Sequence, residues 1–171
     1  VDFDWDVTRL PMEDYGLTFY MGNHREIAGC THVNGDWVVD GGITCLSDER
    51  AMLLFGDVRW QLSEFEVSLQ RWEQGSAVCF GVLGARRYIE IVRINQTMFH
   101  INKVENGKIH HLSEVIISHV KSAQISLHIV CVSHIIIFKV DGLTVGKLFI
   151  NEDALAGGLG FISAHKNSIL I

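Results

Sequence analysis

The feature that most constrains this chain is the alternation of apolar and polar side chains that recurs in its later two-thirds. In residues 64–72, Phe65, Val67 and Leu69 alternate with acidic and neutral polar side chains, and residues 124–132 alternate in the same way. A period of two residues directs successive side chains to opposite faces of a strand. One face therefore packs on a core and the other meets water, which predicts antiparallel β-strands.

Tight turns separate these strand-like runs. Asn106-Gly107 and Asp141-Gly142 are dipeptides typical of two-residue hairpins, because such residues readily adopt positive φ. The second hairpin is expected to place Phe138 opposite Val145. Many short strands joined by tight turns, with no interleaved helical pattern, predict an all-β fold, a two-sheet antiparallel jelly-roll sandwich.

The chain is predicted to form one domain over residues 1–171, with an irregular N-terminal segment, residues 1–34, wrapping the sandwich. Its 171 residues suffice to bury a core, and 48% of them are hydrophobic. The sequence begins at Val1, so a processed product and a domain of a longer polypeptide both remain open. Compartment and oligomeric state remain open as well.

Charge and hydropathy argue against nucleic acid as a partner and against a membrane-spanning segment. The net charge of −6, without a basic run, disfavours nucleic acid. The longest apolar runs, residues 125–132 and 135–140, have the length of strands, so no membrane span is expected. Of the four cysteines, Cys79 and Cys131 lie in strand-like runs, whereas Cys30 and Cys45 would be able to form a disulfide in an exported protein.

Three motifs in order resemble those of concanavalin A-like, laminin-G-like sandwich domains. They are the segments G-D-W-V-V-D-G-G-I at 35–43, L-L-F-G-D-V-R-W at 53–60 and G-G-L-G-F at 157–161. The resemblance covers roughly residues 35–171. It implies a jelly roll of two curved sheets that serves as a carbohydrate-binding or interaction module, with Trp37 and Trp60 packed inside.

Some members of this superfamily are glycosidases or 3-keto-disaccharide hydrolases, and the chain departs from both patterns. The glucanase motif E-x-D-x-x-E is missing after Glu64, and the opening G-x-x-L-x-x-W of the keto-disaccharide group is missing before Asn34. These departures favour binding over catalysis.

Recognition of a sugar requires planar polar groups for its hydroxyls and an apolar or aromatic surface for its C–H faces. The alternation predicts that seven polar or aromatic side chains form one strip across the concave sheet and bind a glycan or a protein partner. For two of them, Trp72 and Tyr88, packing at the edge of the core is the alternative. The seven residues are Glu66, Gln70, Trp72, Arg86, Tyr88, Glu90 and His100.

An enzyme is the first alternative function. Glu64 and Glu66 lie two residues apart on one strand face, and with Glu90 they would provide the carboxylates of a glycoside hydrolase. Acidic residues that simply solvate a sheet are the simpler interpretation. The second alternative is a non-catalytic structural or assembly domain of a larger protein.

Metal binding is a further hypothesis. His100 and Asn102 share a strand face and, through the predicted hairpin, lie near His111, so a site with Glu90 is conceivable. No cofactor is otherwise implied, although calcium is possible. Candidate oxygen ligands for calcium gather near the two ends of the chain, at Asp2, Asp4, Asp6, Asn151, Glu152 and Asp153.

Overall fold

The computed structural model describes residues 30–39, 41–61, 63–118, 124–151 and 156–171. The expectations for residues 1–29 and for Glu152 and Asp153 lie outside this part. The segment 1–34 departs from the predicted irregular structure at its end, because Cys30–Asn34 form a strand. None of the described residues belongs to a helix long and apolar enough to cross a bilayer.

The larger layer is a seven-stranded sheet in which every neighbouring pair is antiparallel. Its strand order is β1-β4-β14-β7-β8-β9-β10. The strands are β1 (Cys30–Asn34), β4 (Ala51–Phe55), β7 (Ala77–Gly84), β8 (Arg87–Arg93), β9 (Met98–Glu105), β10 (Lys108–Ile116) and β14 (Gly158–Ser163).

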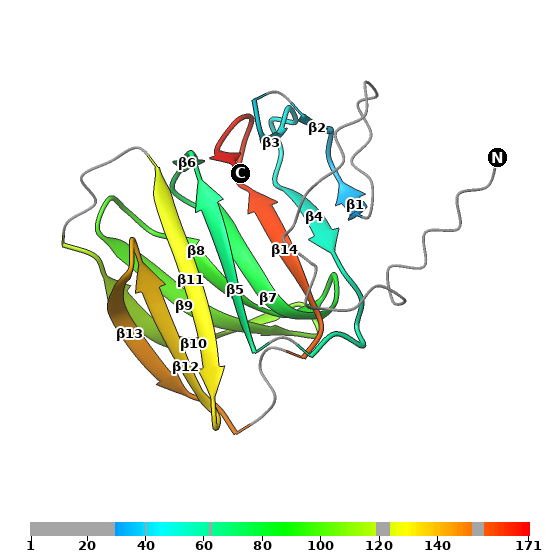
Figure 1. Cartoon of the computed structure of the whole chain (residues 1–171). Coiled ribbons are helices and arrows are strands. Elements are labelled where there is room, and N and C mark those ends of the chain that lie inside the picture. Colours follow the sequence, from blue (N-terminus) through cyan, green and yellow to red (C-terminus); the bar gives the residue numbers. More distant parts are fainter. Residues whose placement is uncertain (1–29, 40, 62, 119–123, 152–155) are drawn as a thin grey trace.

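A four-stranded antiparallel sheet of order β13-β12-β11-β5 lies in front of the large sheet (Figure 1). Its strands are β5 (Glu64–Leu69), β11 (Ile125–Val132), β12 (Ile135–Val140) and β13 (Leu143–Phe149). A small third sheet of order β2-β3-β15-β6 lies at one end of the molecule. It contains β2 (Trp37–Val39), β3 (Ile43–Cys45), β6 (Arg71–Trp72) and β15 (Ile169–Leu170).

One apolar core lies between the two main layers and confirms the predicted antiparallel sandwich. The alternating residues Phe65, Leu127 and Ile129 are buried in it, as expected. Aromatic rings join the layers: the Phe80 ring lies 5.9 Å from that of Phe65 and 6.3 Å from that of Phe138, between centroids. The burial of every second side chain in these strands therefore holds the sheets together.

Both predicted hairpins form, but one register differs from the prediction. Asp141 and Gly142 have φ of 49° and 80°, and Asn106 and Gly107 likewise have positive φ. A β-bulge between Phe138 and Lys139 then shifts the pairing of β12 with β13, so that Phe138 lies opposite Gly146 rather than Val145. A bulge adds an unpaired residue that sequence alternation does not reveal.

The cysteines are not paired with one another. No disulfide joins any two of the four, so the structure does not contain the one considered for Cys30 and Cys45. Cys45 and Cys79 are fully buried. Burial also raises the pKa of the Cys30 thiol to about 12, so this thiol is almost entirely protonated at neutral pH.

Candidate functional site on the outer face of the large sheet

Three polar side chains lie in register across β8, β9 and β10, on the face that points away from the core. Glu90 pairs with Asn102, and Asn102 pairs with His111. Their neighbours Ile89 and Ile101 point to the opposite face and pack in the core. Strand alternation thus places a carboxylate, an amide and an imidazole side by side on the outer face.

The three side chains are joined in a chain of hydrogen bonds. Asn102 Nδ2 donates to Glu90 Oε1 at 3.0 Å, and Asn102 Oδ1 lies 3.1 Å from His111 Nδ1. A carboxylate only accepts, so the amide nitrogen must face Glu90 and the amide oxygen must face His111. His111 therefore carries its proton on Nδ1, and Nε2 of the neutral ring is an acceptor available to a ligand.

A second polar row continues the site. Glu114 pairs with His100, and His100 Nε2 lies 3.5 Å from Glu114 Oε1. The rings of His100 and His111 are 4.6 Å apart between centroids, which brings the two rows together. We call the five residues of the two rows, Glu90, His100, Asn102, His111 and Glu114, the outer polar cluster.

Apolar side chains flank this cluster on two sides. Tyr88, Val104 and Ile109 lie in one row across β8, β9 and β10, and Ile109 is 65% exposed. Towards β4 and β14 the outer face carries a buried apolar cluster that includes Met52, Cys79 and Ile162. The outer polar cluster is therefore confined to the β8–β10 end of the sheet.

Burial divides the outer polar cluster into a base and a rim. Glu90 is 5% and Asn102 7% exposed, whereas His111 and Glu114 are exposed and His100 is half-buried. The buried Glu90–Asn102 pair thus holds His111 in a fixed orientation from below. A ligand can reach the histidines and Glu114.

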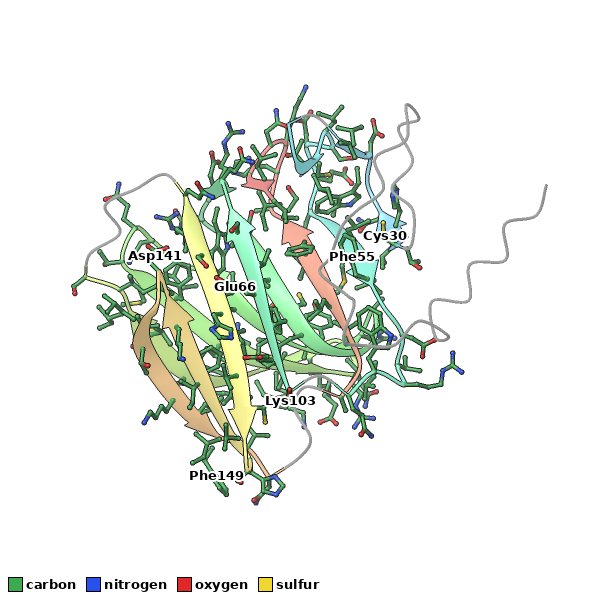
Figure 2. The ribbon with its side chains drawn as sticks, in the orientation of Figure 1. Cys30, Phe55, Glu66, Lys103, Asp141 and Phe149 are labelled. Carbon is green, nitrogen blue, oxygen red and sulfur yellow. The ribbon has the colours of Figure 1, made fainter. Side chains whose placement is uncertain are left out.

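The structure separates the seven residues predicted to form one strip. Glu66 lies on β5 of the other sheet (Figure 2), and its Oε1 accepts a hydrogen bond from Ser126 Oγ. Gln70 follows β5 and donates to the carbonyl of Gly41, and Arg86 lies in the turn after β7 and donates to the carbonyl of Asn106. The prediction of one shared strip is therefore wrong.

The two aromatic members of the strip are buried. Trp72 is 2% exposed, and its Nε1 donates to the Ser76 carbonyl. It points inward because the alternation breaks after β5, where Gln70 and Arg71 are both exposed. Tyr88 is on the outer face, but its ring is covered, and burial raises the pKa of its hydroxyl. Of the seven, Glu90 and His100 belong to the outer polar cluster.

The sequence indicates part of this cluster and misses part of it. The expected proximity of His100, Asn102 and His111 is confirmed by the register and the hydrogen bonds. Glu114 is missed because a β-bulge between His111 and Ser113 changes the alternation just before it. A bulge of this kind leaves no signal in the sequence.

Two other predicted arrangements are not formed among the described residues. Glu64 and Glu66 lie on the outer face of the four-stranded sheet, whereas Glu90 lies on the outer face of the large sheet, so the three carboxylates do not meet. No group of three or more histidine, cysteine or acidic side chains in the described ranges has a geometry that holds a metal ion. A small cavity between the sheets is lined by hydrophobic side chains only, so it has no partner for a polar ligand.

Comparison with known proteins identifies the fold. No protein-family model matches the chain, and no curated protein matches it. Among solved structures, the carbohydrate-binding module CBM66 from Bacillus subtilis is similar, with a TM-score of 0.62, 18% identity, and coverage of 81% of this chain and 89% of that chain.

Two further structures have the same architecture. The Bacillus licheniformis β-glucanase has a TM-score of 0.59 and 12% identity over 84% of this chain and 82% of its own. Sheep galectin-11 has a TM-score of 0.51 and 8% identity over 72% of this chain and 92% of its own. The chain therefore has the concanavalin A-like jelly-roll fold of lectins and glucanases.

Proposed function

We propose that the chain is a carbohydrate-binding module and that the outer polar cluster is its binding site. The observation that carries this proposal is the hydrogen-bond chain from Glu90 through Asn102 to His111. It fixes the orientation of an exposed polar group before any ligand arrives. A group that is already oriented loses little conformational freedom on binding.

The rim of the cluster matches the chemistry of a sugar. Each sugar hydroxyl donates one hydrogen bond and accepts others, and His111 Nε2 and the Glu114 carboxylate are acceptors for such donors. Ile109 is exposed in the row next to His111 and offers an apolar surface to the C–H face of a sugar ring. A site with polar groups on one side and an aliphatic group on the other suits a pyranose or furanose ring.

The fold supports the same proposal. Structures with this architecture include a protein described as a carbohydrate-binding module and another described as a carbohydrate recognition domain. No tryptophan or tyrosine among the described residues is exposed, so neither residue type in this part of the chain offers a fully exposed ring to a sugar. We therefore expect weak binding, with a Kd of about 10 μM to 1 mM.

A glycan array with the full chain, followed by calorimetric titration of the best glycan, tests this function. His111→Ala removes the oriented acceptor, and we expect it to weaken binding by about tenfold, the equivalent of one good hydrogen bond. His165→Ala is the matched control, because His165 is an exposed histidine in the turn after β14. An array without bound glycans, or equal affinity in His111→Ala and wild type, would contradict the proposal.

A further inference from the structure

The outer face of the four-stranded sheet carries a second organised surface, unrelated to the outer polar cluster. Strand pairing aligns Glu64 with Val130, Val130 with Ile137, and Ile137 with Lys147. These four side chains form a row across β5, β11, β12 and β13, which we call the charged row. It begins with an acid, ends with a base and has two aliphatic side chains between them.

The neighbouring row on this face is apolar. Val132 pairs with Ile135, and Ile135 pairs with Phe149. Val132 is 53% and Phe149 65% exposed, and Phe149 projects from the end of β13 (Figure 2). Three exposed hydrophobic side chains in one row, next to two half-buried ones, form an apolar patch of the kind that marks an interface.

Charge is distributed unequally across the same face. Glu64 and Glu66 lie on β5, at one edge of the sheet, whereas Lys139 and Lys147 lie on β12 and β13, towards the other edge. In the described part of the chain, neither lysine forms an ion pair. A partner for this face must therefore offer acids opposite β13, bases opposite β5 and apolar groups between them.

We propose that this partner is a second copy of the chain, packed face to face about a twofold axis that runs parallel to the strands between β11 and β12. Rotation about such an axis reverses the order of the strands while keeping each row at its own level. Read in reverse, the charged row is its own complement. The resulting interface is isologous, as in most homodimers.

The twofold arrangement gives every member of the charged row a suitable partner. Glu64 faces Lys147 of the partner subunit, and Val130 faces Ile137 of the partner subunit. The apolar row places Val132 opposite Ile135 of the partner subunit. Glu64 Oε2 already contacts His128 Nε2 at 3.0 Å, but its side chain is 61% exposed, so the carboxylate can accept from a lysine as well.

The dimer would leave the proposed sugar site open. The charged row and the outer polar cluster lie on the outward faces of the two opposite layers. A back-to-back dimer would then present two sugar sites facing away from each other. Such bivalency strengthens attachment to a surface that carries many glycans. The dimer itself does not depend on the proposed sugar binding.

Sedimentation velocity of the full chain, from micromolar to near-millimolar concentration, tests the proposal through a charge swap. Wild type is expected to dimerise. Glu64→Lys and Lys147→Glu each place like charges together at both symmetry-related contacts, and we expect each variant to weaken dimerisation by about tenfold or more. Mixing the two variants restores opposite charges across the interface and is expected to recover the dimer.

Lys166→Glu is the control, because it reverses the charge of an exposed lysine in the turn after β14. It is expected to leave the dimer intact. If circular dichroism shows that either reversal unfolds the chain, Lys147→Gln is used instead, with a smaller loss expected. A wild-type protein that is monomeric at every concentration would overturn the proposal. So would a dimer that tolerates both single reversals, or one that the mixture does not recover.

Discussion

Ile129→Ala is expected to destabilise the protein by about 2–5 kcal/mol, the range found when a buried aliphatic side chain is truncated in a packed core. Ile129 is fully buried in the centre of β11, between β5 and β12. Truncation removes buried carbon atoms, and with them the free energy gained by their burial. It also leaves a cavity that the neighbouring strands cannot fill. Urea unfolding followed by tryptophan fluorescence measures the change in free energy.

Ile116→Ala is the matched control for this experiment. Ile116 is the same residue type in β10, but it is 65% exposed. Its truncation is expected to change the free energy of unfolding by no more than about 0.5 kcal/mol. Equal effects of the two substitutions would show that the alternation does not direct Ile129 into the core.

Asn102→Leu is expected to cost about 2–3 kcal/mol of stability, because it leaves the Glu90 carboxylate without the amide that donates to it. Both residues are buried on the outer face, and the Asn102 Nδ2 to Glu90 Oε1 distance is 3.0 Å. The same substitution removes the acceptor for His111 Nδ1, so the imidazole also loses its fixed orientation. Sugar affinity is therefore expected to fall in the same variant.

The double variant Glu90→Leu with Asn102→Leu separates the two effects. It removes the buried carboxylate together with its donor, and we expect it to recover most of the stability lost in the single variant. Sugar affinity is expected to stay low, because His111 is still without its support. Recovery of both stability and affinity would show that the hydrogen-bond chain does not orient His111.

Alternation and turn chemistry were sufficient to predict the class of fold. The period of two in residues 64–69 and 124–132 depends only on local backbone geometry, and the positive φ of Asn106-Gly107 depends only on residue type. Such local features can be recognised in a single sequence. The fold, the core residues of β5 and β11 and the hairpins were therefore predicted correctly.

The candidate site was predicted only in part, because alternation does not identify the sheet to which an outward side chain belongs. Glu66 and Glu90 both point away from the core, yet they lie on opposite layers of the sandwich. Their separation results from long-range strand order, which places β5 beside β11 and β8 between β7 and β9. A side chain that the sequence predicts to point outward can therefore lie on the outer surface of either sheet.

Irregular positions account for the other errors. Counting in twos from Glu66 predicts an outward Trp72, but the chain leaves β5 at Gln70 and enters another sheet at β6. Glu114 follows the bulge in β10, so the alternation that precedes the bulge does not predict the direction of its side chain. Sequence alternation predicts a side chain's direction only as far as the next irregularity.

Nuclear magnetic resonance of the histidine side chains, recorded during titration with a glycan selected on the array, shows which face of the sandwich binds the glycan. We expect the ring signals of His100 and His111 to shift together and to saturate with the added glycan. The ring signals of His128, on the other sheet, and of His165 would stay in place. Shifts at His128 with unchanged His100 and His111 signals would contradict the assignment of the site to the outer face of the large sheet.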